Sequence, residues 1–271
     1  MLNRPLIAAA AIAGLALPGF AFAQALTWNF ADRSAPGGAC TGTYASNGNT
    51  INCQTSPSGT TTTLQARAYS STGTSGRFET ASVNDQSTSG FGSGNRVEGY
   101  AVTAAPGHAF DNDGTGADAL LLDFEGVSRV LSSVTLGWSG ADADFQVLRW
   151  TGAANATITT VQATLVGKTA AETVAVAGGW ELVSSVAGAS WISNPTLSDQ
   201  TYGLSAVNAQ ATSSSYWLIS AYNSGFGGTG VGASNDTFTI VGVTTRVSAP
   251  GTLALAGLGL LGAAFLRRRN A

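Results

Sequence analysis

Residues 133–138 read Ser-Val-Thr-Leu-Gly-Trp, and residues 237–243 read Thr-Phe-Thr-Ile-Val-Gly-Val. In the first stretch Val134, Leu136 and Trp138 fall on one face of an extended chain, and the second stretch alternates in a similar way. Alternation with a period of two is typical of a strand with one buried face. Thr, Val and Trp also fit a pleated, half-buried surface. Both stretches therefore predict β-structure.

Runs of the same kind recur through the middle of the chain, each bounded by Gly, Ser, Asn or Asp. We expect about eleven strands and no helix of useful length between the two ends. The pattern predicts an all-β fold, a two-sheet antiparallel jelly-roll-like sandwich, with an apolar helix at each end of the chain. A parallel β-solenoid is the alternative, although the sequence has no internal repeat of 20–50 residues. The expected strands are Leu26–Phe30, Thr62–Ser70, Arg77–Val83, Arg96–Val102, Ala119–Phe124, Ser133–Trp138, Phe145–Thr151, Thr159–Leu165, Trp180–Val186, Ser215–Tyr222 and Asp236–Val247.

The composition narrows the class of protein. With 44% hydrophobic residues and six Trp the chain is too apolar for a disordered protein. Residues 24–247, the expected sandwich domain, carry 8 basic and 15 acidic residues, a formal charge of −7. An acidic domain without a basic cluster argues against a nucleic-acid partner and against anionic membrane surfaces. It is compatible with divalent cations and neutral glycans.

The N-terminus has the pattern of an export signal. Asn3 and Arg4 form a short positive region, and Leu6–Leu17 is an apolar run of 12 residues. A small-x-small site ends at Ala23, so we expect signal peptidase to remove residues 1–23 and leave Gln24 first; Ala23-Gln24-Ala25 is the alternative site and would leave Leu26 first. The alternative, a membrane anchor, is disfavoured because 12 helical residues span only ~18 Å of a ~30 Å bilayer core.

Export to an oxidising compartment would determine the oxidation state of the two cysteines. Cys40 and Cys53 enclose 12 residues rich in Gly, Asn, Ser and Thr. In an oxidising compartment the simplest interpretation is a disulfide that closes a hairpin or loop. Zinc would need four soft ligands, and two Cys with one His cannot supply them. Free thiols remain the alternative.

The C-terminus, residues 248–271, combines a short motif, an apolar segment and a cluster of arginines. Gly251–Leu266 contains no charge and would reach ~24 Å as a helix. The arginines would stay on the cytoplasmic side of a membrane. The residues that define the two ends of the segment are Ser248, Ala249, Pro250 and Gly251, then Arg267, Arg268 and Arg269.

This tail resembles the PEP-CTERM sorting signal of Gram-negative bacteria, the substrate tag of exosortases. Pro250-Gly251-Thr252-Leu253-Ala254-Leu255 and Gly257-Leu258-Gly259 match it, as does the arginine cluster. Ser248-Ala249-Pro250 stands where Pro-Glu-Pro is usual, so one Pro and the Glu are missing. The resemblance implies an exosortase as a processing partner, transient anchoring in the inner membrane, and a final location at the cell surface or outside the cell. A plain C-terminal anchor is the alternative.

A second resemblance covers about residues 99–152. His108-Ala109-Phe110-Asp111-Asn112 precedes a Leu-Leu-Leu strand, and Gly137-Trp138 with Asp142 and Asp144 follows. This order is similar to exosortase-dependent surface proteins with a His-Ala-Leu-Asp-Asn motif, with Phe110 in place of Leu. The resemblance implies a surface location and no particular biochemical activity.

The same segment holds the best candidate for a ligand site, an oxygen-rich loop interrupted by Gly. Calcium takes six to eight hard oxygen ligands, often from such loops, although the EF-hand spacing is not met. Asp142 and Asp144 could add ligands if their loop lies nearby. The alternative is a solvated turn in which Asp and Asn bind their own backbone. The candidate calcium ligands are Asp111, Asn112, Asp113 and Asp118.

No catalytic residues are predicted. The sequence contains no Gly-x-Ser-x-Gly nucleophile elbow whose serine His108 could activate as a general base. We therefore expect His108 to be a structural hydrogen-bonding residue. Glycoside hydrolysis needs two facing carboxylates, and the sequence alone selects no pair. The Trp side chains could stack on sugars or form the core. The Trp residues in question are Trp138, Trp150, Trp180, Trp191 and Trp217.

Three functions therefore stay open. The first is a non-enzymatic exported surface or extracellular-matrix protein. The second is a secreted glycan-binding module for an extracellular polysaccharide, which rests on analogy with jelly-roll lectins. The third is a secreted hydrolase. We expect the first.

Overall fold

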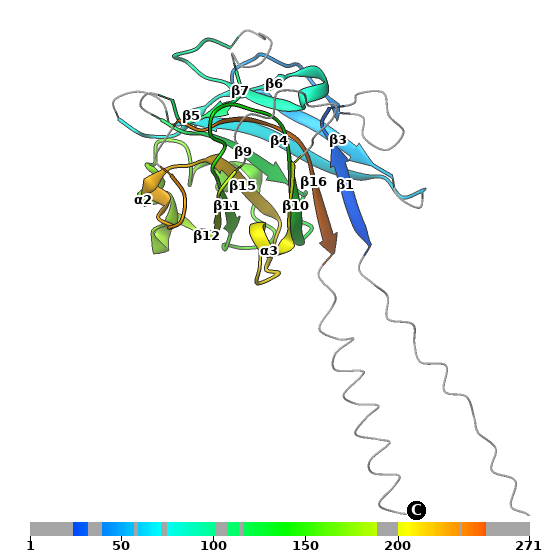
Figure 1. Cartoon of the computed structure of the whole chain (residues 1–271). Helices are drawn as coiled ribbons and strands as arrows, with labels where there is room; N and C mark the ends of the chain where they lie inside the picture. Colours follow the sequence, from blue (N-terminus) through cyan, green and yellow to red (C-terminus); the bar gives the residue numbers. More distant parts are fainter. Residues whose placement is uncertain are drawn as a thin grey trace, which may run out of the picture.

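Two antiparallel β-sheets of eight strands each are found in the described part of the protein, shown here as a computed structural model (Figure 1). The structure describes residues 24–31, 40–56, 59–71, 75–100, 108–113, 116–188, 200–232 and 235–247. The expected signal peptide and sorting tail lie outside these residues, and so do Ala23, Ser248–Gly251 and the three terminal arginines. All pairings between the named strands are antiparallel. The predicted mainly β architecture with two antiparallel sheets is confirmed.

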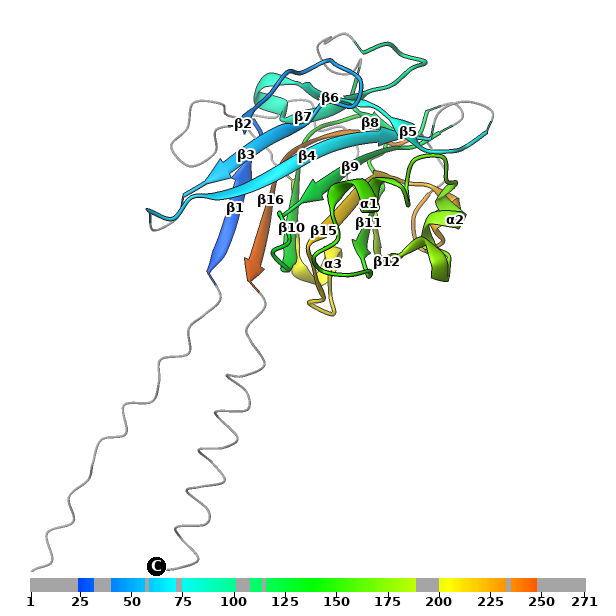
Figure 2. The ribbon, with the colours of Figure 1, turned by 180° about the vertical axis from the view of Figure 1, so that it is seen from behind.

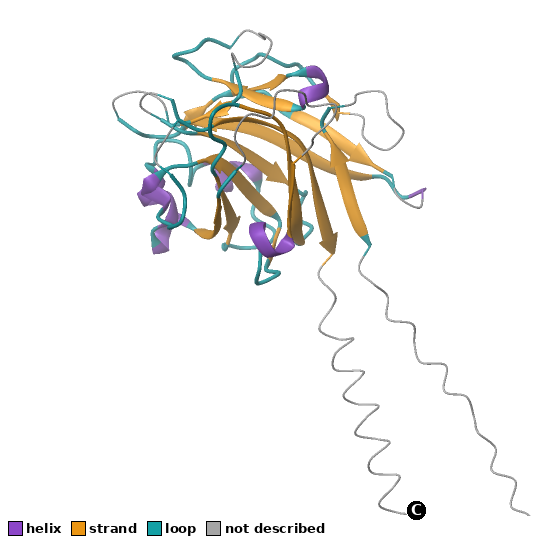
Figure 3. Ribbon diagram, in the orientation of Figure 1, coloured by secondary structure: helices purple, strands orange, loops and turns teal. Residues whose placement is uncertain are grey.

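The first sheet is organised around its last strand. Its main order is β13-β10-β16-β7-β6, while β1 and β8 also pair with β16 and β14 pairs with β10. Figure 3 shows that strands make up most of the described domain and that the short helices lie at its periphery. The strands are β1 (Ala25–Asn29), β6 (Ser82–Asp85), β7 (Phe91–Gly94), β8 (Phe110–Asp111), β10 (Arg129–Ser139), β13 (Gln200–Gly203), β14 (Ser213–Ser214) and β16 (Thr237–Val247).

The second sheet has the order β12-β11-β15-β9-β4-β3-β2, and β5 pairs with β4. Neighbours in this sheet are often distant in sequence, because β15 lies between β11 and β9. The strands are β2 (Cys40–Thr41), β3 (Ile51–Thr55), β4 (Thr62–Ser70), β5 (Glu79–Thr80), β9 (Asp118–Asp123), β11 (Phe145–Trp150), β12 (Trp180–Val186) and β15 (Tyr216–Ala221).

Short helices cover part of the second sheet, and Figure 2 shows α1 and α2 on that side of the molecule. Val161 and Leu165 from the α1 region pack against Leu121 and Leu148 on the outer face of the sheet. The helices are α1 (Ile158–Gln162), α2 (Ala170–Val174) and α3 (Leu204–Val207), with 3₁₀ turns η2 (Ser87–Ser89), η3 (Val176–Gly178) and η4 (Ser224–Phe226). None of the helices among the described residues has the length and apolarity to span a membrane.

The helical cover explains the unbroken Leu-Leu-Leu run of β9. Leu120 and Leu122 belong to the hydrophobic core between the sheets, together with Trp217 and Phe238. Leu121 points to the opposite face and belongs to a second core beneath the helices. All six residues of β9 are buried, because both faces of the strand are covered. A strand that is buried on both sides does not need to alternate.

The two ends of the described domain lie next to each other. Strand β1 pairs with β16 in a register that places Ala25 opposite Arg246. Both views show the start of β1 beside the end of β16 (Figures 1 and 2). The chain therefore enters and leaves this domain at one edge.

The expected strand Arg77–Val83 is divided, because Glu79–Thr80 forms β5 of the second sheet and Ser82–Asp85 forms β6 of the first. Two other expected strands are wrong. Thr159–Leu165 lies in α1 and the turns after it, because Thr157 caps the helix by accepting a hydrogen bond from the Thr160 backbone N–H. Its β-branched residues suggested a strand, but the packing of Val161 and Leu165 decides the conformation. Within Arg96–Val102, the described residues form a turn closed by a hydrogen bond from the Gly99 N–H to the Asn95 carbonyl.

The predicted disulfide is confirmed: Cys40 and Cys53 are bonded to each other. They are directly opposed in the β2–β3 pair, and both are buried. The predicted loop is thus a hairpin at the edge of the second sheet.

Candidate metal centre

The four residues predicted as calcium ligands do not converge on one point. Asp111 ends β8, which pairs with the beginning of β16, and Phe110 beside it turns inward to pack on Phe238. Asp113 is exposed, and its carboxylate accepts a hydrogen bond of 3.0 Å from Asn235 Nδ2. Asp118 begins β9 and is 1% exposed. Of the four, only Asp111 and Asp118 come together.

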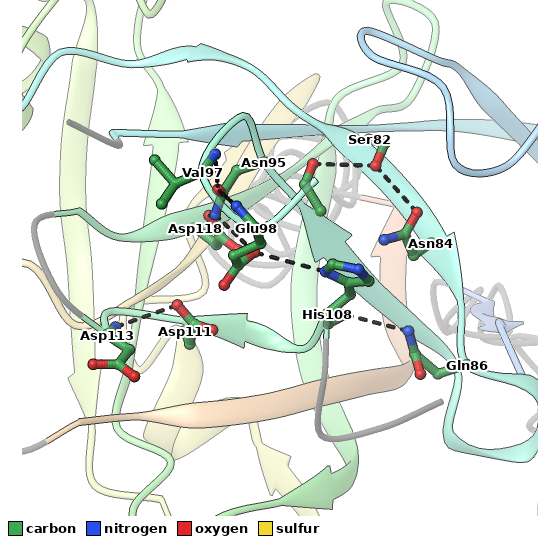
Figure 4. A network of polar contacts seen from close by, with 11 residues as sticks. Ser82, Asn84, Gln86, Asn95, Val97, Glu98, His108, Asp111, Asp113 and Asp118 are labelled. Atoms are coloured by element: carbon green, nitrogen blue, oxygen red, sulfur yellow. Dashed lines mark hydrogen bonds and ion pairs between the residues drawn. The ribbon is translucent and has the colours of Figure 1, made fainter. Parts of the chain in front are cut away.

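A third carboxylate joins this pair from a different part of the chain. Glu98, Asp111 and Asp118 each offer an oxygen, and these three oxygens lie within 4.8 Å of one another. Figure 4 shows the three side chains pointing toward one another. Glu98 comes from the turn after β7, so it reaches the pair through tertiary structure. We call Glu98, Asp111 and Asp118 the first acidic cluster.

Asn95 positions Glu98 within this cluster. Its Oδ1 accepts hydrogen bonds from the backbone N–H groups of Val97 and Glu98, at 2.9 and 3.1 Å. Its Nδ2 donates to Glu98 Oε2 at 2.8 Å and approaches Asp118 Oδ1 at 3.5 Å. The amide therefore shapes the turn on one side and holds two carboxylates on the other.

The hydrogen bonding around Asp118 is incomplete. Asp118 Oδ2 is buried and has no hydrogen-bond partner among the described residues. The hydroxyls of Ser70 and Ser93 lie close enough to lower the pKa of Asp118. Both hydroxyls are nevertheless fully buried and also lack a partner with hydrogen-bond geometry in the described part of the chain. Two unsatisfied hydroxyls thus lie near the unsatisfied carboxylate oxygen of Asp118.

His108 borders the same cluster. Its Nδ1 lies 3.8 Å from Glu98 Oε2, and the side chain is 7% exposed. Its carbonyl accepts a hydrogen bond of 3.3 Å from Gln86 Nε2. His108 adopts φ +147°, a backbone conformation that costs energy for a residue with a side chain. The imidazole Nδ1 is buried and has no hydrogen-bond partner among the described residues, so of the predicted hydrogen-bonding role only the contact of the backbone carbonyl is seen.

Burial and like charges disfavour full ionisation of the cluster. Burial raises the pKa of Asp111, and the charges of Asp118 and Glu98 raise it further. Burial also raises the pKa of Asp118, to which the charge of Glu98 adds. Both pKa values lie well above the ordinary value of Asp. Either a proton or a cation is needed to offset the charge of three carboxyl groups at neutral pH.

Asn112 belongs to a second acidic cluster, formed by Asp142, Asp144 and Asp236. Asn112 Nδ2 donates to Asp236 Oδ2 at 2.6 Å, and Asn112 Oδ1 accepts from the Asp236 N–H. Asp142 and Asp144, which the sequence offered as further ligands for the predicted loop, therefore lie with Asn112 and not with Asp111.

The second acidic cluster is satisfied by backbone groups. Asp144 accepts hydrogen bonds from the N–H groups of Gly188 and Gly232, at 2.9 and 2.6 Å. Asp236 Oδ1 accepts one from the Asp144 N–H at 2.8 Å. These carboxylates therefore fasten loops to each other. Asp118 in the first acidic cluster differs, because its Oδ2 has no hydrogen-bond partner among the described residues. The second acidic cluster therefore holds loops together, whereas the first has an oxygen left for a ligand.

Among the residues that the structure describes, the tryptophans do not form an exposed platform. Trp150, Trp180 and Trp217 are buried in the two cores, and Trp138 is partly buried. Trp191 lies outside the described residues. The described Trp side chains thus serve the core.

Sequence analysis missed Glu98 and Asn95. The pattern Asn95-Arg-Val-Glu98-Gly99 is typical of a turn, but its neighbours suggested a strand.

A scan against protein-family models, a search of curated proteins and a search of solved structures each found no match to this chain.

Proposed function

We propose that the chain is a non-enzymatic exported surface or extracellular-matrix protein, with a C-terminal segment that an exosortase processes. The observation that carries the proposal is the pairing of β1 with β16, with Ala25 opposite Arg246. A domain that begins and ends at one edge can be cut or anchored there without disturbing its opposite end. The Cys40–Cys53 bond also supports export, because such bonds persist in oxidising compartments.

The position of the two chain ends suggests how the domain is oriented relative to a membrane. Strand β16 runs from Thr237, which pairs with Asp111, to Val247 at the edge where the chain leaves the domain. Antiparallel strands rise about 3.4 Å per residue, so the eleven residues of β16 extend over at most roughly 34 Å. A tail that holds the domain at a membrane would therefore present both acidic clusters on the outward side.

The sandwich itself we propose to be of jelly-roll type. Support comes from the strand order, in which β16 lies between β10 and β7 and β15 between β11 and β9. Such insertions of late strands between earlier ones are a feature of Greek-key connections.

No specific observation favours either alternative function, the glycan-binding module or the secreted hydrolase. A lectin needs an exposed aromatic platform, and most of the described tryptophans are in the core. In a retaining glycosidase the carboxyl groups are about 5–5.5 Å apart and face a substrate cleft. In the first acidic cluster the carboxylate oxygens lie within 4.8 Å of one another and Asp118 is buried.

The test is the intact mass of the protein recovered from cells and from medium. We expect the mature form to begin at Gln24 or Leu26 and to lack Arg267, Arg268 and Arg269. Replacing the three arginines by Ala should leave the tail attached, whereas Arg246→Ala, a basic residue outside the tail, should be processed normally. A surface form that keeps both ends would overturn the proposal. A form that loses the signal peptide but retains residues 248–271 would overturn the exosortase step.

A further inference from the structure

We infer that Glu98, Asp111 and Asp118 form a binding site for a divalent cation with hard-ligand preference, namely calcium. The sequence pointed to calcium at a contiguous loop, but the structure brings together a different set. This inference concerns the distal end of the domain and does not depend on how the tail is processed.

The first support is the geometry of the donors. Three carboxylate oxygens within 4.8 Å of one another come from three separate segments, the turn after β7, the end of β8 and the start of β9. Two of these segments are fixed by strand pairing, Asp111 with Thr237 and Asp118 with Ser70. The donors are therefore held in place by the sheets.

The second support is independent of the clustering of charge. Asp118 Oδ2, Ser70 Oγ and Ser93 Oγ belong to side chains that are at most 1% exposed, and none has a hydrogen-bond partner among the described residues. Buried polar atoms are nearly always paired, so each of these three requires a partner. A cation would accept electron pairs from all three oxygens.

The Ser70 and Ser93 hydroxyls are themselves donors beside the Asp118 carboxylate, but neither reaches Asp118 Oδ2 with hydrogen-bond geometry. The other donors nearby do not satisfy this oxygen either. Asn95 Nδ2 is already directed at Glu98, and His108 Nδ1 is 3.8 Å from Glu98 Oε2, beyond hydrogen-bond distance. The second acidic cluster shows the contrast, because its carboxylates accept backbone N–H groups. Within the described segments, the first acidic cluster accepts one backbone N–H, that of Asp113, at 3.2 Å from Asp111 Oδ1.

The type of donor selects the metal. Carboxylates and hydroxyls are hard oxygen ligands, which suit calcium and magnesium rather than zinc or copper. Calcium tolerates irregular coordination and takes carboxylates in one- or two-oxygen mode, whereas magnesium requires a regular octahedron and loses water reluctantly. A site assembled from three segments and two serine hydroxyls fits calcium better.

The experiment uses the full chain in detergent, freed of metal with a chelator and then dialysed against CaCl₂ or MgCl₂. We expect one calcium per chain by elemental analysis, with a Kd in the range of 10⁻⁴–10⁻³ M that is common for extracellular modules. At calcium a hundredfold above Kd the melting temperature should rise by roughly 5–10 °C. Magnesium should give a smaller rise at equal concentration.

Matched variants separate the site from general charge effects. Asp111→Asn and Glu98→Gln should weaken calcium binding at least tenfold. Asp113→Asn, two residues from Asp111 in the same segment, should bind calcium as the wild type does. If Asp111→Asn fails to fold, Glu98→Gln still decides, because Glu98 lies in an exposed turn.

Two results would overturn the inference. One is a wild-type melting temperature that does not change across the titration, with no calcium retained after dialysis. The cluster would then hold only a proton shared between carboxyl groups. The other is an unchanged calcium affinity in Glu98→Gln together with a loss of affinity in Asp113→Asn, which would return the site to the exposed loop.

Discussion

Asp111 and Asn112 are adjacent in the chain, yet their side chains lie in two different acidic clusters. Asp111 approaches Glu98 and Asp118, while Asn112 exchanges two hydrogen bonds with Asp236. The end of β8 is extended, so consecutive side chains point to opposite faces. A run of acidic and amide residues that suggests one loop site is therefore divided between two environments.

The disulfide should contribute substantially to stability. Replacing both Cys40 and Cys53 by Ala should lower the free energy of unfolding by about 3 kcal/mol, because the bond closes a loop of this size in the unfolded chain. Urea unfolding monitored by tryptophan fluorescence measures the difference. Wild-type protein treated with a reductant is the matched control and should lose a comparable amount. Equal midpoints for oxidised and reduced protein would contradict the prediction.

The β9 strand offers a test of the second core. Leu121→Ala and Leu122→Ala should each cost about 2–5 kcal/mol of unfolding free energy, because the two side chains are fully buried on opposite faces. Val176→Ala, at an exposed position, should change stability by less than about 0.5 kcal/mol. If Leu121→Ala behaved like Val176→Ala, the helices would not cover the outer face of the sheet.

The second acidic cluster should make stability depend on pH. Burial above all, and then the charges of Asp144 and Asp142, raise the pKa of Asp236 to about 7. An Asp in the unfolded chain has a pKa of about 3.9, so between these values the folded state binds a proton that the unfolded state releases. This contribution to stability is fully present below about pH 4 and is lost as the pH rises through 7.

With a chelator present, the melting temperature of the wild type should fall as the pH rises from about 5 to 8. The slope from one group is at most about 1.4 kcal/mol per pH unit. Asp236→Asn cannot titrate, so its melting temperature should fall less steeply over the same range. Scanning calorimetry at several pH values gives both slopes, and identical slopes would exclude Asp236 as the group responsible.

The capping box of α2 should make a small but measurable contribution to the free energy of unfolding. The Thr169 hydroxyl accepts a hydrogen bond from the Glu172 N–H, and the Glu172 carboxylate accepts one from the Thr169 N–H. Thr169→Ala should destabilise the protein by about 1 kcal/mol. Thr159→Ala, at an exposed position inside α1, is the control and should change the unfolding midpoint little. A larger effect at Thr159 than at Thr169 would contradict the assignment.

Much of the fold follows from local pattern. The strands Thr62–Ser70 and Trp180–Val186 begin and end where the sequence predicted them. Alternation reports which face of a strand is buried, and that information lies within a few consecutive residues. The Cys40–Cys53 bond was predictable for a similar reason, since the chain offers one possible pair.

The elements that the sequence mispredicted depend on contacts from elsewhere. Thr159–Leu165 has β-branched residues, but it becomes helical because Val161 and Leu165 fill the core beneath it. Intrinsic propensities differ by less than about 1 kcal/mol per residue, so the burial of two large side chains outweighs them.

The sequence by itself determined the class of fold, the disulfide, the composition of the acidic segment and the pattern of the two chain ends. Only the tertiary structure decided which carboxylates meet. Glu98 reaches Asp111 and Asp118 because the fold brings the turn after β7 to the end of β8 and the start of β9, and hydrogen bonds hold Asn112 at Asp236 instead. The chemistry of a site depends on distances of a few ångströms between side chains, and residues that are far apart in the chain acquire those distances only when the two sheets pack together.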